Sequence, residues 1–207
     1  MNVEICKDLT FDDGLHVYKL HGVTLPSVTQ LMKPLTDNYY GDTDYEFLKN
    51  AATRGTTIHN SIENYWLFNV VDIPHEYKAY MDAFLKFVEM YKPKPLATEV
   101  RFYHKYLYYA GTADLICTLN GNDNEVWLID YKATAGIHKF LTRIQLEGYK
   151  QGIESQGITI HRKGILHLTK TGKFTLDDEY DDEHDSESLE VFSALLTLYN
   201  YMKKNKK

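Results

Sequence analysis

The sequence lacks three features that would assign it to a class of protein at once. It has two cysteines in 207 residues, Cys6 and Cys117, too few for a disulfide framework, a four-thiolate metal site or an iron–sulfur cluster. It has no run of about 18 apolar residues, so no membrane span is expected. Its first residues contain no basic segment followed by an apolar block, so we expect no secretory signal and a reducing, cytoplasmic setting.

Internal repeats and Pro-, Gly- or Ser-rich linkers are also absent from the sequence. Hydrophobic residues make up 43% and charged residues 25%, the balance of a globular protein with a real core. We therefore predict a single domain over 1–207. Residues 1–95 would form N-terminal strands and helices, 96–176 a central core, and 177–207 an acidic segment with a C-terminal helix.

Charge is unevenly distributed along the chain. The net charge is −6, but residues 177–190 hold nine acids and no Lys or Arg. Without that stretch, 23 basic residues stand against 20 acidic ones, a net charge of +3. We interpret the acidic run as a solvated loop leading into the last helix. The remaining surface can still carry a basic groove, so the overall charge does not exclude a nucleic-acid partner.

Hydrophobic periodicity and turn residues predict an α/β (α+β) fold with a central mixed sheet flanked by helices and an N-terminal helical extension. Ser27 is a candidate N-cap, and Gly55 a candidate break in the second helix. The expected helices cover 27–34, 43–69, 75–92, 138–156 and 186–204, and the expected strands lie within 2–24 and over 97–107, 108–119, 125–133, 158–169 and 173–176.

The hairpin around NGNDN at 120–124 carries the first candidate site. If its strands are symmetric about Asn122, Asp114 lies opposite Asp130, with Cβ atoms about 4.5–5.5 Å apart. Like charges in that arrangement are destabilising, and a divalent cation such as Mg²⁺ between them would offset the repulsion. Lys132 follows Asp130 by two residues, so it points to the same face. The alternatives are an exposed hairpin edge or a β-bulge that shifts the pairing.

Two helical patterns add polar candidates. In residues 54–66, Ile58, Ile62 and Tyr65 share one face, and His59 and Glu63 share another. In residues 138–156, Gln145 and Tyr149 are four apart and lie on one face. Each of these polar residues could equally be an ordinary surface residue.

In this order, the segments resemble motifs of the RecB-type branch of the PD-(D/E)xK nuclease superfamily, which includes phage exonucleases and the mitochondrial genome maintenance exonuclease. The resemblance spans roughly residues 15–170. The matching segments are VTLPSVTQLM (23–32), RGTTIH (54–59), TEVRFY (98–103), GTADLI (111–116), LIDYKAT (128–134) and the Gln and Tyr of 145–149.

This resemblance implies a restriction-endonuclease-like core and a metal-dependent DNA exonuclease. It implies Mg²⁺ or Mn²⁺ on His59, Asp114, Asp130 and the backbone carbonyl of Tyr131, and a catalytic role for Lys132 beside the two aspartates. Glu99 matches a position that is commonly acidic and could add a ligand, and Glu63 matches a frequent Glu one turn after the histidine. Gln145 and Tyr149 match a motif thought to position the active site and nucleic acid.

The expected partner is DNA, single-stranded or with a free end, with no membrane and no iron–sulfur cluster involved. No helicase motor is present, so a recombination or replication protein could supply unwinding. Arg54, Lys139, Arg143 and Lys150 are candidate phosphate contacts. Tyr39, Tyr40 and the group Tyr103, Tyr106, Tyr108 and Tyr109 could stack on unpaired bases, although core packing explains most tyrosines equally well.

Three other functions stay open. The same core could belong to an endonuclease, which would cut circular DNA. The chain could be a catalytically silent DNA-binding accessory protein. It could also be an interaction protein that mimics DNA through the acidic run at 177–190. The setting would be a bacterial cytoplasm, or a host cytoplasm if the protein is phage-encoded.

Overall fold

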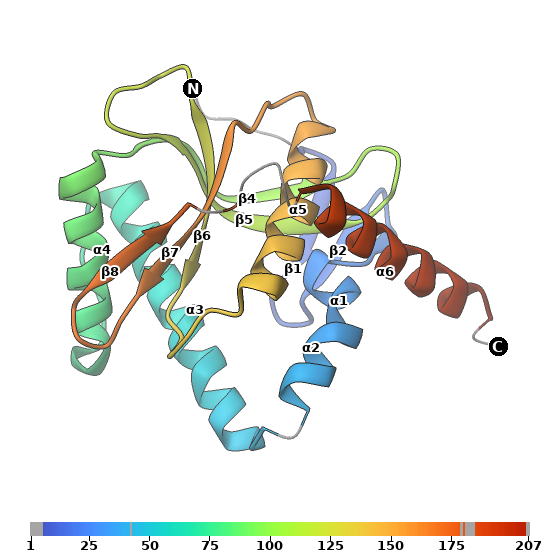
Figure 1. The fold of residues 1–207 in the computed structure, drawn as a ribbon, viewed down its shortest axis with the longest axis horizontal. Helices are drawn as coiled ribbons and strands as arrows, with labels where there is room; N and C mark the ends of the chain where they lie inside the picture. Colours follow the sequence, from blue (N-terminus) through green and yellow to red (C-terminus); the bar gives the residue numbers. More distant parts are fainter. Residues whose placement is uncertain (1–5, 42, 179, 181–184, 206–207) are drawn as a thin grey trace.

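The computed structural model describes residues 6–41, 43–178, 180 and 185–205. In these residues the chain is α+β, with a five-stranded and a three-stranded sheet flanked by helices (Figure 1). The small antiparallel sheet contains β1 (Leu9–Asp12), β2 (Val17–Leu20) and β3 (Val23–Leu25). It confirms the short strands expected near the start of the chain.

The five-stranded sheet has the order β4-β5-β6-β7-β8 and is mixed. Strands β4 (Lys94–Tyr103), β5 (Ala110–Thr118) and β6 (Val126–Lys132) are antiparallel neighbours. Helix α5 (Lys139–Glu154) then crosses over to β7 (Arg162–Leu168), which is parallel to β6, and β8 (Phe174–Asp177) is antiparallel to β7. A parallel pair requires such a crossover connection.

Strand β4 begins earlier than the sequence predicted and includes Pro95. It is an edge strand, where a residue without an N–H can face away from the ladder. The register shifts between Pro95 and Ala97, which absorbs the irregularity. The expected strand over 97–107 is therefore wrong at both ends, because proline ends a helix but does not exclude an edge strand.

Helices near the start of the chain also differ from the prediction. Ser27 caps α1 (Val28–Leu31) through a reciprocal capping box with Gln30, as expected, but a second helix, α2 (Lys33–Tyr40), follows at once. Helix α3 (Tyr45–Phe68) continues through Gly55 without a break. A glycine costs a helix only about 1 kcal/mol, which tertiary packing can offset.

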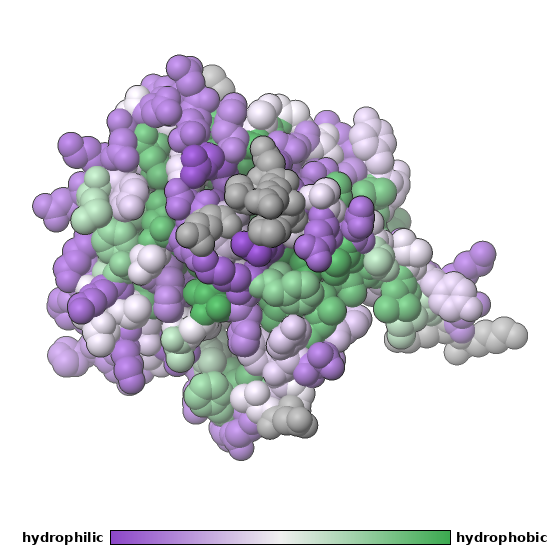
Figure 2. Space-filling model, viewed as in Figure 1, coloured by the Kyte–Doolittle hydropathy of each residue, from purple (hydrophilic) through white to green (hydrophobic). Residues whose placement is uncertain are grey.

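The helices form layers on the two faces of the large sheet (Figure 1). Helices α3 and α4 (Lys78–Tyr91), the latter preceded by a 3-10 turn at His75–Tyr77, pack on one face through a core that includes Ile58, Met81 and Leu115. Helices α1, α5 and α6 (Asp185–Asn205) share a core on the other face. Apolar side chains gather beside α1 and α5 on the face shown in Figure 2.

Helix α5 approaches its neighbours closely because it carries two glycines on its packed side. A Cβ atom at Gly152 would overlap the ring of Phe102 on β4. One at Gly148 would lie 2.7 Å from the ring of Phe192 on α6. The hydroxyl of Tyr109 also donates to the Gly148 carbonyl at 2.8 Å. These contacts fix the position of α5 between the sheet and α6.

A buried group of charges also joins α5 to β7 and α6. Lys163 is only 4% exposed; its Nζ lies 2.8 Å from Glu147 Oε2 and also contacts Asp185. Lys150 pairs with the same Asp185 at 3.2 Å. We call Glu147, Lys150, Lys163 and Asp185 the α5–α6 ion cluster. Its two acids and two bases balance.

The expected solvated acidic run is wrong for two of its members. Asp177 is partly buried and pairs with Lys139 at 3.2 Å, and Asp185 belongs to the α5–α6 ion cluster. Asp178 is exposed and pairs with Arg162 at 2.9 Å on the surface. The remainder of the run includes residues 179 and 181–184, which lie outside the described residues. None of the helices in the described part of the chain is long and apolar enough to cross a bilayer.

Candidate functional site

The central hairpin has the predicted register. Its four paired positions run from Leu115–Ile129 to Thr118–Val126 and are symmetric about Asn122. The ladder ends one pair before Asp114 and Asp130. There the backbone N–H of Tyr131 donates to Asp114 Oδ2 at 2.6 Å, so a side chain takes the place of a backbone acceptor. The predicted direct pairing of Asp114 with Asp130 is therefore not part of the ladder.

The neighbouring ladder is interrupted at the same level. Pairs Thr98–Leu115 and Val100–Ala113 bracket Glu99 and Asp114, which are not paired. Glu99 has a φ of 45°, a left-handed conformation that costs a non-glycine residue about 1–3 kcal/mol. Glu99, Asp114 and Asp130 therefore form a row across three adjacent strands. We call these three residues the acid row.

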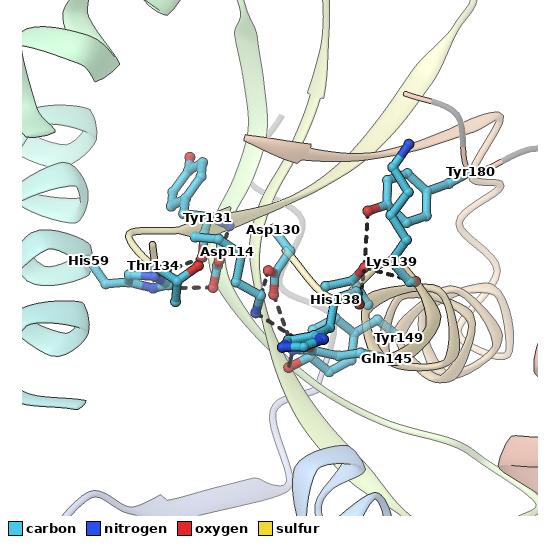
Figure 3. A network of polar contacts seen from close by, with 12 residues as sticks. His59, Asp114, Asp130, Tyr131, Thr134, His138, Lys139, Gln145, Tyr149 and Tyr180 are labelled. Carbon is cyan, nitrogen blue, oxygen red and sulfur yellow. Dashed lines mark hydrogen bonds and ion pairs between the residues drawn. The ribbon is translucent and has the colours of Figure 1, made fainter. Parts of the chain in front are cut away.

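His59 reaches the acid row from α3. Ile58 and Ile62 are fully buried in the core between α3 and the large sheet, as the sequence predicted, and His59 lies on the adjacent part of the helix surface, at the edge of that core. Its Nδ1 lies 3.4 Å from Asp114 Oδ1 and 3.8 Å from Glu99 Oε1. Its Nε2 lies 3.2 Å from the Tyr131 carbonyl oxygen (Figure 3). The two ring nitrogens of His59 thus face different groups: Nδ1 faces the carboxylates, and Nε2 faces the carbonyl.

Lys132 and α5 complete the other end of the acid row. Nζ of Lys132 lies 2.6 Å from Asp130 Oδ2 and donates to Gln145 Oε1 at 3.2 Å. The Gln145 amide in turn donates to Asp130 Oδ1 at 3.1 Å and to the Tyr149 hydroxyl at 2.9 Å (Figure 3). Asp130 Oδ2 is buried, and the Lys132 ammonium group is its close charged partner.

Burial and mutual charge perturb the acidity of these groups. Burial raises the pKa of Glu99 and of Asp130 above the ordinary values, despite the nearby His59 and Lys132. Burial also raises the pKa of Asp114, but the charge of His59 outweighs it and the net shift is downward. Burial opposes charge on His59 and Lys132, yet the carboxylates raise the pKa of both. The acid row therefore attracts cations strongly.

The donor set fits a hard divalent cation. One ligand atom each from His59, Glu99 and Asp114 lies within 4.8 Å of the others. Three carboxylates outnumber the charge of Lys132 even when His59 is protonated, and Mg²⁺ and Mn²⁺ favour carboxylate and carbonyl oxygens. The compact group includes Glu99, which the sequence indicated only by its place in a motif. Asp130 lies beside that group and is paired with Lys132.

A cavity of about 700 Å³ opens beside the acid row, between the small sheet, α3 and the β4–β5 pair. Its lining includes His59, Glu63, Glu99 and Tyr149 from the predicted site, and Arg101 and Tyr18 from outside it. Glu63 therefore lies near the site, one turn beyond His59. The cavity is large enough for a nucleotide-sized group.

The four candidate phosphate contacts have different surroundings. Arg54 donates from Nε to the Ala133 carbonyl at 2.9 Å, directly after Lys132, so it borders the site. Arg143 is half-buried on α5. Lys139 pairs with Asp177. The prediction for Lys150 is wrong, because this residue belongs to the α5–α6 ion cluster on the other side of α5.

The candidate stacking residues also separate into two groups. Tyr39 and Tyr40 contact the His138 ring, with ring centroids 5.8 and 5.3 Å apart, and Tyr106 and Tyr108 are exposed. Tyr109 is fully buried, so its predicted contact with bases is wrong. The partly buried Tyr103 packs on the core of the small sheet.

Comparison with known proteins adds little to this description. No protein-family model matches the chain, and no curated protein matches it. Among solved structures, the crystal structure of SSO0001 is similar over 69% of this chain and 74% of that chain, with 13% sequence identity and a TM-score of 0.31. Similarity at this level supports no inference about function, so the site must be interpreted from its own residues.

Proposed function

We propose that the protein is a Mg²⁺- or Mn²⁺-dependent deoxyribonuclease of the RecB-type branch of the PD-(D/E)xK superfamily. We further propose that it acts as an exonuclease on single-stranded DNA ends. The observation that carries the proposal is the acid row with Lys132 at one end and His59 at the other. Such an excess of buried carboxylates costs stability unless a cation occupies the site.

The order of strands supports a restriction-endonuclease-like core. Three antiparallel strands, β4, β5 and β6, carry the acid row, and α5 and the parallel strand β7 follow. Gln145 and Tyr149 of α5 contact Asp130 directly or through one another. Motif residues that are distant in the sequence therefore meet in one network.

The residues that would hold the metal are His59, Glu99 and Asp114, together with Asp130 and the Tyr131 carbonyl. A bound divalent ion lowers the pKa of a coordinated water and polarises a phosphate. Lys132 is placed to hold the attacking water or to stabilise charge on the phosphate as the phosphodiester bond breaks. Gln145 fixes both Lys132 and Asp130, and Tyr149 fixes Gln145.

Exposed aromatic rings beside the site support a single-stranded substrate. Tyr39, which is 51% exposed, lies next to His138 and Phe140, which is 45% exposed. Tyr40 adjoins the same group; burial raises its pKa, and the charge of the nearby Lys132 offsets part of that rise. Unpaired bases stack on such rings, whereas bases within a duplex cannot.

End-labelled linear single strands, linear duplexes and single-stranded circles, each incubated with Mg²⁺, Mn²⁺ or EDTA, test the proposal. We expect metal-dependent shortening of linear single strands and intact circles. Lys132→Ala should lose cleavage, and Lys78→Ala, which removes an exposed lysine paired with Asp82, should retain it. Cleaved circles would replace the exonuclease with an endonuclease. No cleavage of any substrate would refute the nuclease.

A further inference from the structure

The cavity beside the acid row has an unusual charge balance for a site that would receive a polyanion. Its lining contains Asp13, Glu63 and Glu99. Among the described residues that line it, Arg101 is the only Lys or Arg. Arg101 is therefore the permanently charged side chain in this lining that can pair with a nucleic-acid backbone entering the cavity.

Arg101 is placed on the reactive side of the sheet. It follows Glu99 by two residues on β4, so both side chains point to the same face of the sheet. The alternating residues Val100 and Phe102 are buried on the opposite face. Two residues along a strand span about 6.5–7 Å. The Cα atom of Arg101 therefore lies about one backbone repeat from that of Glu99, and the Arg101 side chain lines the same cavity.

The small N-terminal sheet supports this guanidinium group. Its central carbon lies 5.0 Å from the centroid of the Phe11 ring, and the Phe11 ring packs on Tyr18 with centroids 4.4 Å apart. Tyr18 is buried, and its hydroxyl shares a hydrogen bond with Thr112 of β5 at 2.8 Å. The aromatic wall is therefore anchored to the catalytic sheet and holds Arg101 in one place.

The existing ion pair of Arg101 is weak enough to be replaced. Arg101 and Asp13 are 3.8 Å apart, with side chains 49% and 82% exposed. Exposed pairs of this kind contribute little free energy. A phosphate offers the guanidinium two oxygens in a geometry that allows paired hydrogen bonds.

We propose that Arg101, backed by Phe11, binds the backbone phosphate next to the one that is cleaved. The small sheet is then part of the substrate site rather than an appendage, and Asp13 competes with the substrate for Arg101. This inference rests on the proposed nuclease function and deepens it. It assigns one end of the bound strand to the cavity between the small sheet and α3.

Binding of a labelled single-stranded DNA, followed by fluorescence anisotropy over a series of NaCl concentrations, tests the assignment. All variants carry Lys132→Ala, which prevents cleavage. We expect Arg101→Gln to weaken binding at least tenfold and to reduce the slope of log affinity against log salt by about 0.7. Asp13→Asn should tighten binding about two- to threefold. Lys94→Gln, which removes an equal charge from the far end of β4, should leave binding unchanged.

The outcomes separate this inference from the proposed function. If the unmodified protein cleaves DNA but Arg101→Gln binds like Lys94→Gln, the phosphate site is refuted and the nuclease stands. An Arg101→Gln variant with weaker binding and an unchanged salt slope would also refute a phosphate contact. If no variant binds and the unmodified protein does not cleave, both proposals fail. Thermal unfolding of each variant checks that the fold is retained.

Discussion

Two buried groups of charge lie on opposite sides of α5, and they differ in balance. In the α5–α6 ion cluster, Lys163 and Lys150 match Glu147 and Asp185. In the acid row, three carboxylates face Lys132 and His59. The first group is internally satisfied. The second has a pair of interrupted ladders and a strained Glu99.

This difference separates a structural ion cluster from a binding site. Opposite charges that neutralise one another hold helices and strands together, and such a neutral cluster does not attract a further ion. An excess of one sign, held in place by the surrounding strands, lowers stability until a counter-charge arrives. The two groups should therefore respond in opposite ways to substitution, and four measurements examine that contrast, beginning with the largest effect.

Breaking the balanced cluster should have the largest effect on stability. Lys163→Met leaves Glu147 buried without its partner, and we expect the free energy of unfolding in urea to fall by about 3–5 kcal/mol. Replacing both residues, with Glu147→Leu added, should recover most of the loss. Cleavage by the folded protein should persist in both. A loss below about 1 kcal/mol for the single variant would show that the cluster is not a structural element.

Removing the lysine of the acid row should affect catalysis more than stability. Lys132→Ala should slow cleavage about 10²–10³-fold, because in the proposed nuclease this lysine would stabilise charge that develops on the phosphate. Its folding cost should be smaller than that of Lys163→Met, because Asp130, whose pKa burial has already raised, can take up a proton instead. Single-turnover cleavage rates beside urea unfolding measure both effects. Equal rates in Lys132→Ala and Lys78→Ala would contradict the assigned role.

Removing a carboxylate should change the stability of the protein in opposite directions in the two groups. In EDTA, Glu99→Gln should stabilise the protein by roughly 1 kcal/mol, because it relieves repulsion from Asp114. The stabilisation gained on adding Mn²⁺ should shrink in the same variant. Asp185→Asn, the matched change in the balanced cluster, should instead lower stability with no effect of Mn²⁺. Thermal unfolding with and without Mn²⁺ measures both effects. A stability change of the same sign in Glu99→Gln and Asp185→Asn would contradict the difference between the two groups.

The smallest effect is a dependence of stability on pH. The folded pKa of Glu99 is raised by burial, so the unfolded state loses its proton first as pH rises. Glu99 therefore contributes stability at low pH that is lost as pH rises from about its ordinary value of 4.5 through the folded pKa. In EDTA, the stabilising effect of Glu99→Gln should accordingly grow over that range. A difference that is constant with pH would show that Glu99 does not titrate abnormally.

Local patterns in the sequence predicted the frame of the site. Alternation and a strong turn placed the hairpin, and symmetry about Asn122 gave its register. Helical spacing placed Ile58 and Ile62 in the core, and His59 with Glu63 on a different face of the same helix. The four-residue spacing of Gln145 and Tyr149 predicted that they would meet, and they share a hydrogen bond.

What the sequence could not indicate depends on contacts between distant segments. Lys163, Glu147 and Asp185 lie 16 to 38 residues apart, and nothing local marks them as partners. The left-handed conformation of Glu99 gives no signal in residue type, because glutamate has no preference for it. Arg101 and Phe11 meet only because the small sheet folds back onto β4. Helix α2 was missed because Pro34, in its first turn, is as typical of the residues after a helix end as of a helix start.

The two glycines of α5 have a consequence for how this protein can vary. Gln145 and Glu147 project from opposite sides of α5. The helix packs so closely on the rings of Phe102 and Phe192 that no methyl group fits at Gly148 or Gly152. Any side chain introduced at 148 or 152 would push α5 outward. This shift would separate Gln145 from Lys132 and Glu147 from Lys163. The acid row and the α5–α6 ion cluster would then be disturbed together. We therefore expect positions 148 and 152 to tolerate less change than many residues nearer the acid row.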